Sequence, residues 1–235
     1  MMSVMIPSRD RPHELQGALD SLGLAINGFE ALIWLDDDDP QLDKYKELFE
    51  SDSNVRLFIK KRVGYKQSHR MLNFLSQQAK YNWIFQFNDD AYMDNLEWFK
   101  IFKDFVKQFD PVKEPVVINL WGQGEIIANL FPIVSRAYIN ILGYYSGATT
   151  CDEYVRMVAI GANISHNLNG IKPKHRKYGG ENPLRDQTFR EVENDRTEVK
   201  KVWNEKKKML PKSLQDDINK IIQHKNGQKV IHHAS

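Results

Sequence analysis

The chain has a single cysteine, Cys151, among its 235 residues. One thiol cannot form an internal disulfide, and it excludes the zinc sites that are built from several cysteines. Long apolar runs are also missing, because no stretch approaches the roughly 18–20 residues that a membrane-spanning helix needs. The segment from Met1 to Pro12 lacks the basic and then apolar layout of a secretory signal. We therefore expect a protein of the reducing cytoplasm without a membrane span.

Glycine and proline are too scarce to indicate a fibrous or disordered chain. There are 13 Gly and 9 Pro, and 41% of the residues are hydrophobic. This composition is typical of globular proteins. A chain of this length can bury a large core in one domain, with or without a small appendage.

The net charge of +2 is unevenly distributed along the chain. From Lys172 to the C-terminus there are 16 Lys and Arg against 9 Asp and Glu, whereas the first 171 residues hold 17 against 22. A basic terminal region can be a solvated helical surface, or it can bind a polyanion. We expect a catalytic body at residues 1–170 and a basic, mainly helical extension at residues 171–235 that packs on the same domain.

Apolar runs and helical spacing alternate along the body. The apolar runs predict strands at Ser3–Ile6, Ala31–Leu35, Val55–Ile59, Trp83–Phe87, Pro115–Leu120 and Ala159–Ser165. Helical spacing predicts helices at Glu14–Leu24, Leu42–Phe49, Gln67–Ala79, Leu96–Phe109, Glu191–Met209 and Ser213–His224. This alternation is typical of an α/β fold with a mainly parallel sheet flanked by helices.

Polar residues follow three of the predicted strands, at Pro7–Arg11, Asp36–Asp39 and Asn88–Asp90. Ligands of such sheets bind at the carboxyl ends of the strands. The adjacent carboxylates of Asp89 and Asp90 repel each other unless a cation lies between them. Mn²⁺ or Mg²⁺ binds such oxygens together with substrate phosphates. The alternative is that these residues cap a following helix.

Charged side chains near the other strand ends have separate interpretations. Asp36 is the one aspartate of its run that the strand positions, and it could accept a hydrogen bond from a ligand amide or imide. The other aspartates fit a solvated turn. Cations near the strand ends could bind a diphosphate, and about half of them would be ordinary surface. They are Arg9, Arg11, Lys60, Lys61, Arg62, Lys66 and Arg70.

Several segments in the same order resemble the GT-A glycosyltransferases of the family-two type. They are Val4–Pro12, Trp34–Asp37, Gly64 followed by Asn73, Phe87–Asp90, Phe131–Arg136, Ile141–Gly143 and Cys151–Glu153. The resemblance covers Met1 to His166. It implies a GT-A (Rossmann-like) fold and a metal-dependent, inverting transfer of a sugar from a nucleoside diphosphate sugar to an acceptor hydroxyl.

The resemblance also implies which residues bind the donor. Pro7, Ser8 and Arg9 would line the nucleotide pocket, and Asp36 would contact the base. We expect Arg11, Arg62, Lys66, Asn88 and Asp89 to contribute to the same nucleotide-sugar site.

The metal and the base have their own candidates by the same resemblance. Asn88, Asp89 and Asp90 would stand in for the family's Asp-x-Asp motif. Asn replaces the first Asp, which leaves Asp90 as the direct ligand of Mn²⁺ or Mg²⁺. His166 would complete the metal site, although it could be an ordinary histidine, and His175 is the alternative.

The catalytic base would be Asp152 or Glu153. Neighbouring residues of a helix point about 100° apart, so only one of the two can face the acceptor. We favour Asp152. The segment Trp121–Glu125 could stack on a sugar or a base, or pack in the core.

The acceptor is open at this stage. Related compact enzymes glycosylate hydroxymethylated pyrimidines in viral DNA, which would place the protein in the host cytoplasm. The basic segments Lys172–Arg176, Lys200–Lys201 and Lys206–Lys208 would suit DNA. Polysaccharides, proteins and small molecules are the other acceptors. A nucleotidyltransferase of the same fold is an alternative, but Pro7–Arg11 has no glycine for the loop that such enzymes carry. A non-catalytic binding module is a third reading.

Overall fold

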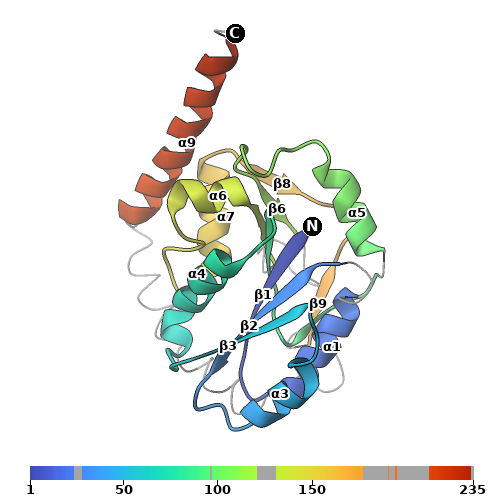
Figure 1. Ribbon diagram of the computed structural model, residues 1–235. Helices are drawn as coiled ribbons and strands as arrows, with labels where there is room; N and C mark the ends of the chain where they lie inside the picture. The colour runs from blue at the N-terminus through green and yellow to red at the C-terminus, as the bar shows by residue number, and fades with distance from the viewer. Residues whose placement is uncertain are drawn as a thin grey trace.

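The computed structural model describes residues 1–23, 28–95, 97–120, 131–176, 190, 194 and 212–233. The main sheet has the strand order β3-β2-β1-β4-β7-β6-β8 (Figure 1). The bounds are β1 Met2–Ser8, β2 Glu30–Asp36, β3 Val55–Lys60, β4 Trp83–Gln86, β6 Val117–Asn119, β7 Ile133–Ser135 and β8 Ser165–Asn167. The first four strands in that order are parallel, and β7 is antiparallel to β4 and β6. The predicted α/β class with a mainly parallel sheet is confirmed.

The central parallel strands β1, β2 and β4 form because their apolar runs are buried on both faces of the sheet, whereas the edge strand β3 is partly exposed. All residues of β2 are buried, and successive side chains point to opposite faces. Ile33 belongs to one hydrophobic core, whereas Leu32 and Trp34 belong to the other. Five of the predicted strands, from Ser3–Ile6 to Pro115–Leu120, match observed strands to within two residues at each end.

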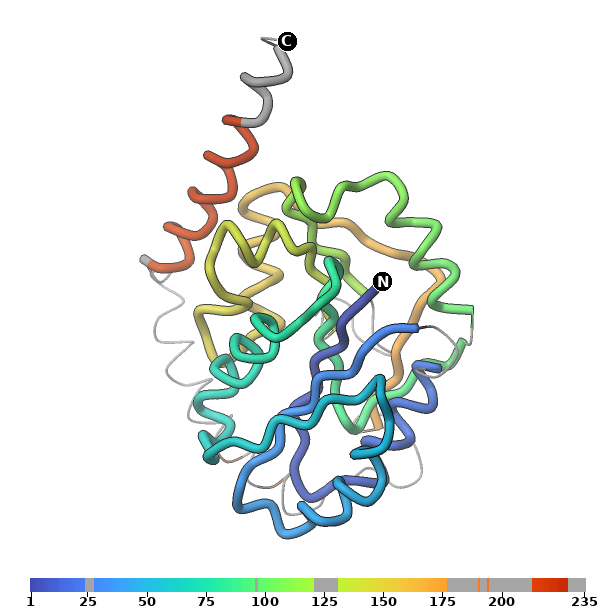
Figure 2. The backbone as a smooth tube through the Cα atoms, in the orientation of Figure 1, coloured from blue at the N-terminus to red at the C-terminus, as the bar shows by residue number. Residues whose placement is uncertain are grey.

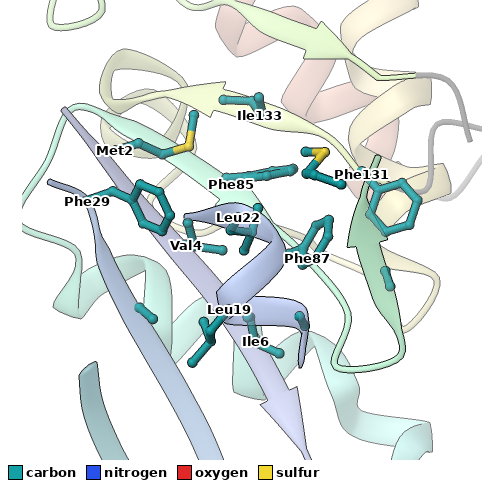
Figure 3. Close-up of a cluster of buried hydrophobic side chains, with 14 of the residues drawn as sticks. Met2, Val4, Ile6, Leu19, Leu22, Phe29, Phe85, Phe87, Phe131 and Ile133 are labelled. Carbon is teal, nitrogen blue, oxygen red and sulfur yellow. The ribbon is translucent and has the colours of Figure 1, made fainter. Parts of the chain in front are cut away.

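One face of the sheet is covered by α1 (Pro12–Leu22), α3 (Leu42–Phe49) and α5 (Trp98–Val106) (Figures 1 and 2). Figure 3 shows side chains of α1 packed against those of β1 and β4 in this first core. Burial of each large apolar side chain contributes about 1.5–3 kcal/mol. The helical residues in this core are Leu15, Leu19, Leu22, Tyr45, Phe49, Trp98, Phe99 and Phe102.

The other face is covered by α4 (Ser68–Gln78), α6 (Arg136–Leu142) and α7 (Cys151–Gly161). A further helix, α9 (Lys212–His233), packs on α6 and α7 from outside. The predicted helix Leu42–Phe49 is confirmed with the same bounds, and the predicted helices Glu14–Leu24, Gln67–Ala79, Leu96–Phe109 and Ser213–His224 are confirmed with shifted ends. The predicted helix Glu191–Met209 lies almost entirely outside the described residues. The division at residue 170 stays a prediction.

A buried carboxylate anchors α9 to the body. Asp217 is 1% exposed and accepts hydrogen bonds from the hydroxyls of Tyr144 at 2.5 Å and Tyr154 at 2.6 Å. The neighbouring Ile218 packs so closely on Gly161 that a Cβ there would lie 2.5 Å from its Cδ1 atom. The helix is therefore held by the hydrogen bonds to Asp217 and by the close packing of Ile218, which the lack of a side chain at Gly161 allows.

One predicted strand is wrong. The run Ala159–Ser165 is not a strand, because its first residues form the end of α7 and β8 begins only at Ser165. Asn163 turns the chain between the two elements with a φ of 52°, in the left-handed region that Asn tolerates. In the described ranges, no helix has the length and the apolar composition that a membrane crossing requires.

Candidate functional site

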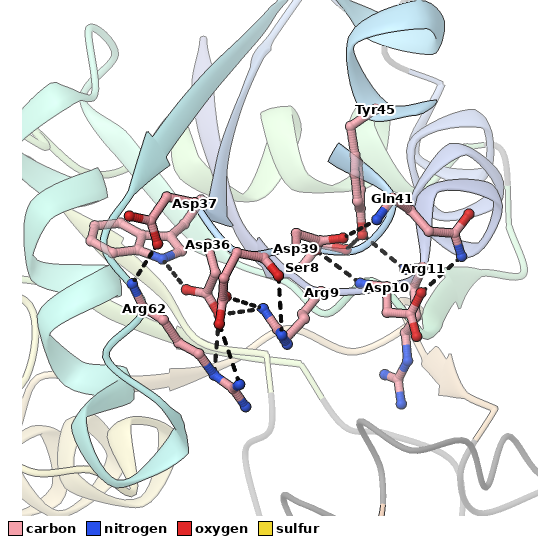
Figure 4. Close-up of polar contacts among 12 residues, drawn as sticks. Ser8, Arg9, Asp10, Arg11, Asp36, Asp37, Asp39, Gln41, Tyr45 and Arg62 are labelled. Carbon is pink, nitrogen blue, oxygen red and sulfur yellow. Dashed lines mark hydrogen bonds and ion pairs between the residues drawn. The ribbon is translucent and has the colours of Figure 1, made fainter. Parts of the chain in front are cut away.

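The carboxyl ends of β1, β2 and β4 bring the three polar segments of the sequence together. Parallel pairing aligns these ends, with Ser8 of β1 opposite Leu35 of β2 and Met5 of β1 opposite Gln86 of β4. The chain then continues into Arg9–Arg11, Asp37–Asp39 and Asn88–Asp90. Figure 4 shows the contacts between the first two of these segments.

Two buried carboxylates share one arginine in this region. Arg11 Nη1 lies 3.2 Å from Asp89 Oδ1 and 3.6 Å from Asp90 Oδ2. The three side chains are only 7% to 9% exposed. Burial raises the pKa of the Asp89 carboxyl to about 7, while Arg11 opposes the rise and Asp90 adds to it. The guanidinium of Arg11 therefore places one positive charge beside the two carboxylates.

A tyrosine from α3 contacts both Ser8 and Arg11. The Ser8 hydroxyl donates to Asp89 Oδ2 at 2.8 Å and lies 2.7 Å from the Tyr45 hydroxyl. Tyr45 also accepts a hydrogen bond from the backbone N–H of Arg11 at 2.9 Å. Burial raises the pKa of Tyr45, so its hydroxyl remains a proton donor. Sequence reasoning missed this residue, because a tyrosine on the apolar face of a helix is normally part of the core.

A small second sheet carries a histidine to Asp90. The strands β5 (Ala91–Met93) and β9 (Pro173–His175) are antiparallel, and His175 pairs with Ala91. His175 Nε2 lies 3.4 Å from Asp90 Oδ1 and 3.1 Å from Asn88 Nδ2. The segment Asn88–Asp90 therefore leads into a strand, and the alternative that it caps a helix is wrong.

The other candidate histidine lies elsewhere in the sheet. His166 belongs to β8, at the end of the strand order, and its ring packs on Phe109 with the centroids 4.8 Å apart. Of the two candidates, the structure brings His175 to Asp90 and leaves His166 on β8.

Asp90 and His175 fit as protein ligands of a divalent ion. In the part of the chain that the structure describes, no group of three or more His, Cys, Asp or Glu residues is arranged to hold a metal. A carboxylate and an imidazole alone suit an ion that takes its other ligands from water and a substrate diphosphate. The donor chemistry of this pair is thus compatible with Mn²⁺ or Mg²⁺ bound together with a nucleotide.

Asp36 organises the end of β2. Its carboxylate accepts a hydrogen bond from Trp34 Nε1 at 3.1 Å and pairs with Arg9 at 3.3 Å. Arg62 Nε approaches the same carboxylate at 3.9 Å. Burial raises the pKa of Asp36, and the arginines oppose that rise. Arg9 also pairs with Asp38 at 2.6 Å. The predicted contact of Asp36 with a nucleotide base stays a prediction.

The segment before α7 is tied to the middle of α4 and to the turn that precedes α4. Asn73 Oδ1 accepts from the backbone N–H groups of Tyr145 and Ser146, at 3.0 and 2.8 Å. The Lys66 backbone carbonyl accepts from Thr149 Oγ1 at 2.6 Å. These hydrogen bonds therefore hold in place the segment that leads into Asp152 and Glu153 at the start of α7.

The remaining predicted residues are placed as follows. Asp152 and Glu153 lie in the first turn of α7, and Pro7 pairs with Trp34 across β1 and β2. Lys174 of β9 forms an ion pair with Asp94. The segments Trp121–Glu125, Lys200–Lys201 and Lys206–Lys208 lie outside the described residues.

Solved structures share this fold, although the sequence alone has no match. No family model matches the chain, and no curated protein does. The structure of S. aureus TarS 1-349 has a TM-score of 0.59 with 14% identity, covering 95% of this chain and 80% of that one. The chain spans 43% of the longer S. aureus TarS structure.

A second neighbour comes from another organism. The mannosyltransferase PcManGT from Pyrobaculum calidifontis, in complex with GDP-Man and Mn²⁺, has a TM-score of 0.60 with 11% identity, covering 95% of this chain and 69% of that one. A TarS 1-349 structure in complex with UDP-GlcNAc has a TM-score of 0.57 with 17% identity, covering 81% and 64%. The chain has the fold of these glycosyltransferases, as the GT-A resemblance implied.

Proposed function

We propose that this chain is a glycosyltransferase that moves a sugar from a nucleoside diphosphate sugar to an acceptor hydroxyl. The observation that carries the proposal is the buried Asp89–Asp90 pair, with its arginine, at the carboxyl ends of the strands of a glycosyltransferase fold. Neighbours with this fold bind UDP-GlcNAc or GDP-Man. A bound diphosphate brings a metal ion to such a site, and the positive charge of the ion complements the two aspartates. The negative charge of the diphosphate complements the arginine.

The donor would bind across the ends of β1 and β2. Pro7, Ser8 and Arg9 line that edge, and Asp36 supplies an acceptor for a base N–H. Arg62 and Lys66 follow β3, where cations can contact phosphate oxygens. Arg9 and Arg62 are held near Asp36 by ion pairs, which keeps two guanidinium groups at this edge before a ligand arrives.

Asp90 and His175 would hold the divalent cation. The 3.4 Å approach of His175 to Asp90 supports His175 over His166 as the second ligand. When bound, the ion neutralises the charge that develops on the leaving diphosphate. Asp89 remains bonded to Ser8 and Arg11, and it adds negative charge beside the ion.

Asp152 would act as the base. In an inverting transfer, the acceptor oxygen bonds to the anomeric carbon while the bond from that carbon to the diphosphate oxygen breaks. The electron pair leaves with the diphosphate, and the proton of the acceptor hydroxyl passes to the base. A bidentate contact of Glu153 with Arg156 supports Asp152 for this role, because it occupies both oxygens of Glu153.

A panel of nucleotide sugars tests the activity without knowledge of the acceptor. We expect at least one donor to be hydrolysed to its nucleoside diphosphate and free sugar in the presence of Mn²⁺ or Mg²⁺, and to stay intact with EDTA. The Asp90→Asn variant should lose this hydrolysis. If no donor is hydrolysed and calorimetry detects no binding of UDP or GDP, the chain is not this kind of enzyme.

For the acceptor we propose a hydroxymethylated pyrimidine in DNA. Exposed Lys172 and Arg176 flank β9, and the backbone N–H of Arg176 donates to the backbone carbonyl of Asp90 at 2.9 Å, which places a cation beside this residue. Sugar transfer should require the hydroxymethyl group, with an unmodified duplex as the control. Duplex binding should weaken steeply with salt, and replacing Lys206, Lys207 and Lys208 by Gln should flatten that dependence. The absence of duplex binding at low salt would remove DNA and leave the other acceptor classes.

A further inference from the structure

We propose that Arg11 is a built-in counter-ion for the Asp89–Asp90 pair, which occupies the pair until a divalent cation and a nucleoside diphosphate arrive together. Arg11 would then keep Asp89 and release Asp90. The consequence is that the metal alone binds weakly, and that nucleotide and metal strengthen each other. This inference rests on the proposed function, because it concerns the same site.

The charge balance of the pair is the first support. Arg11 Nη1 stands within 3.6 Å of both carboxylates, and all three side chains are shielded from water. A metal ion bound to Asp90 would lie beside this guanidinium, where two cations repel each other. A bound diphosphate adds negative charge and gives the guanidinium another partner, so the repulsion falls once the nucleotide is present.

The two carboxylates are held unequally. Asp89 makes the shorter contact with Arg11, at 3.2 Å, and also accepts the Ser8 hydroxyl at 2.8 Å. Asp90 makes the longer contact, at 3.6 Å, and faces His175 on its other oxygen. Because the contact of Arg11 with Asp89 is a hydrogen bond and its contact with Asp90 is a longer ion pair, Asp90 is the carboxylate that Arg11 can release more easily.

The backbone at Arg11 is fixed, so the release needs only a side-chain rotation. The N–H of Arg11 donates to Tyr45, and its carbonyl accepts from Leu15 in the first turn of α1. The preceding Asp10 has a φ of 57° and donates its N–H to Asp39 Oδ2 at 3.0 Å. This arrangement holds a strained residue in place and keeps the start of the Arg11 side chain stationary.

The experiment compares Mn²⁺ binding to the wild-type chain and to Arg11→Met, with and without UDP or GDP, by the electron paramagnetic resonance signal of free Mn²⁺. In the wild type, nucleotide should tighten Mn²⁺ binding about tenfold or more. Arg11→Met should bind Mn²⁺ alone about tenfold more tightly than the wild type, and should gain less from nucleotide. Unchanged binding of Mn²⁺ alone to Arg11→Met would overturn the inference.

Matched variants exclude indirect effects. Arg56→Met removes another arginine beside a buried carboxylate, Glu30, and should leave Mn²⁺ binding as in the wild type. Adding Asp90→Asn to Arg11→Met should abolish the gain, and a gain that persists would contradict the inference. Arg11→Lys keeps the charge and should resemble the wild type.

Thermal unfolding gives a second readout. Without metal, Arg11→Met should unfold at a lower temperature than the wild type, because two buried carboxylates lose their cation. Mn²⁺ alone should restore much of the loss, and no restoration would count against the inference. If Arg11→Met does not fold without metal, folding on addition of Mn²⁺ alone supports the inference, and failure to fold even then counts against the inference.

Two outcomes separate this inference from the proposed function. If nucleotide and Mn²⁺ strengthen each other's binding in the wild type but Arg11→Met changes neither, the counter-ion role of Arg11 is rejected and the proposed function is not. A wild type that binds neither nucleotide nor Mn²⁺ would reject the proposed function as well.

Discussion

Arg156 holds both carboxylate oxygens of Glu153, with Nε 3.1 Å from one and Nη2 3.0 Å from the other. The two residues are three positions apart on α7, so the contact is local to the helix. Asp152, the neighbour of Glu153, points about 100° away around the same helix. The carboxylate of Glu153 is therefore engaged by a residue of its own helix.

The first prediction separates these two residues as catalytic base. Asp152→Asn should reduce sugar transfer by about 10²–10⁴-fold, the usual contribution of a positioned base, and leave binding of donor and metal unchanged. Glu153→Gln should cost far less, because it loses only an ion pair with Arg156. The measurement is the transfer rate beside calorimetric donor affinity. If Glu153→Gln is the inactive variant, we have chosen the wrong neighbour.

The second prediction concerns the histidine of the metal site. His175→Ala should weaken nucleotide-dependent Mn²⁺ binding by about 10-fold or more, because it removes a ligand. His166→Ala is the matched control, since its ring packs on Phe109 away from Asp90. Its Mn²⁺ affinity should stay near that of the wild type. A loss of Mn²⁺ binding in His166→Ala alone would reverse the assignment.

The third prediction concerns the docking of α9. Asp217→Ala should lower the free energy of unfolding by about 2–5 kcal/mol, because it leaves the buried hydroxyl of Tyr154 and the half-buried hydroxyl of Tyr144 without their acceptor. Asp216→Ala removes an exposed carboxylate one residue earlier and should change it by less than about 0.5 kcal/mol. Urea unfolding of both variants measures the difference. Equal effects would mean that Asp217 does not anchor the helix.

The fourth prediction uses the single cysteine as a probe. Burial raises the pKa of the Cys151 thiol to about 12. The thiolate is the reactive form and is a very small fraction of the thiol well below that pKa, so the folded protein should be almost inert to iodoacetamide from pH 7 to pH 9. Labelling followed by mass spectrometry should become fast in 6 M urea, where the thiol regains its ordinary pKa. Rapid labelling of the folded chain would show that Cys151 is accessible.

The strands β1 to β4 and the polar residues that follow them could be predicted from the sequence. Strands buried on both faces are continuous apolar runs, and the polar residues that end them, such as Asp36 and Asp89, stand out against those runs. The GT-A fold could be anticipated from the order of short motifs, and the structure confirms it.

The partners of these residues could not be predicted. A strand of three residues, such as β9, is too short to show a period, so nothing in the sequence pairs His175 with Asp90. The run Ala159–Ser165 was misassigned because an apolar stretch of that length fits a strand as well as a helix end. The contact of Tyr45 with Ser8 joins residues 37 positions apart, and only the packing of α3 on the sheet brings them together.

Because His175 lies on β9, the chain can keep its fold and still lose the histidine that we propose as a metal ligand. His175 is half-buried and lies on the two-stranded sheet with β5, whose Ala91 and Met93 contribute to the first core. A substitution of His175 alone would therefore leave the apolar packing of both cores in place and remove the histidine beside Asp90. Such a chain would keep its fold without the metal ligand that we propose, and selection for stability alone would not remove it.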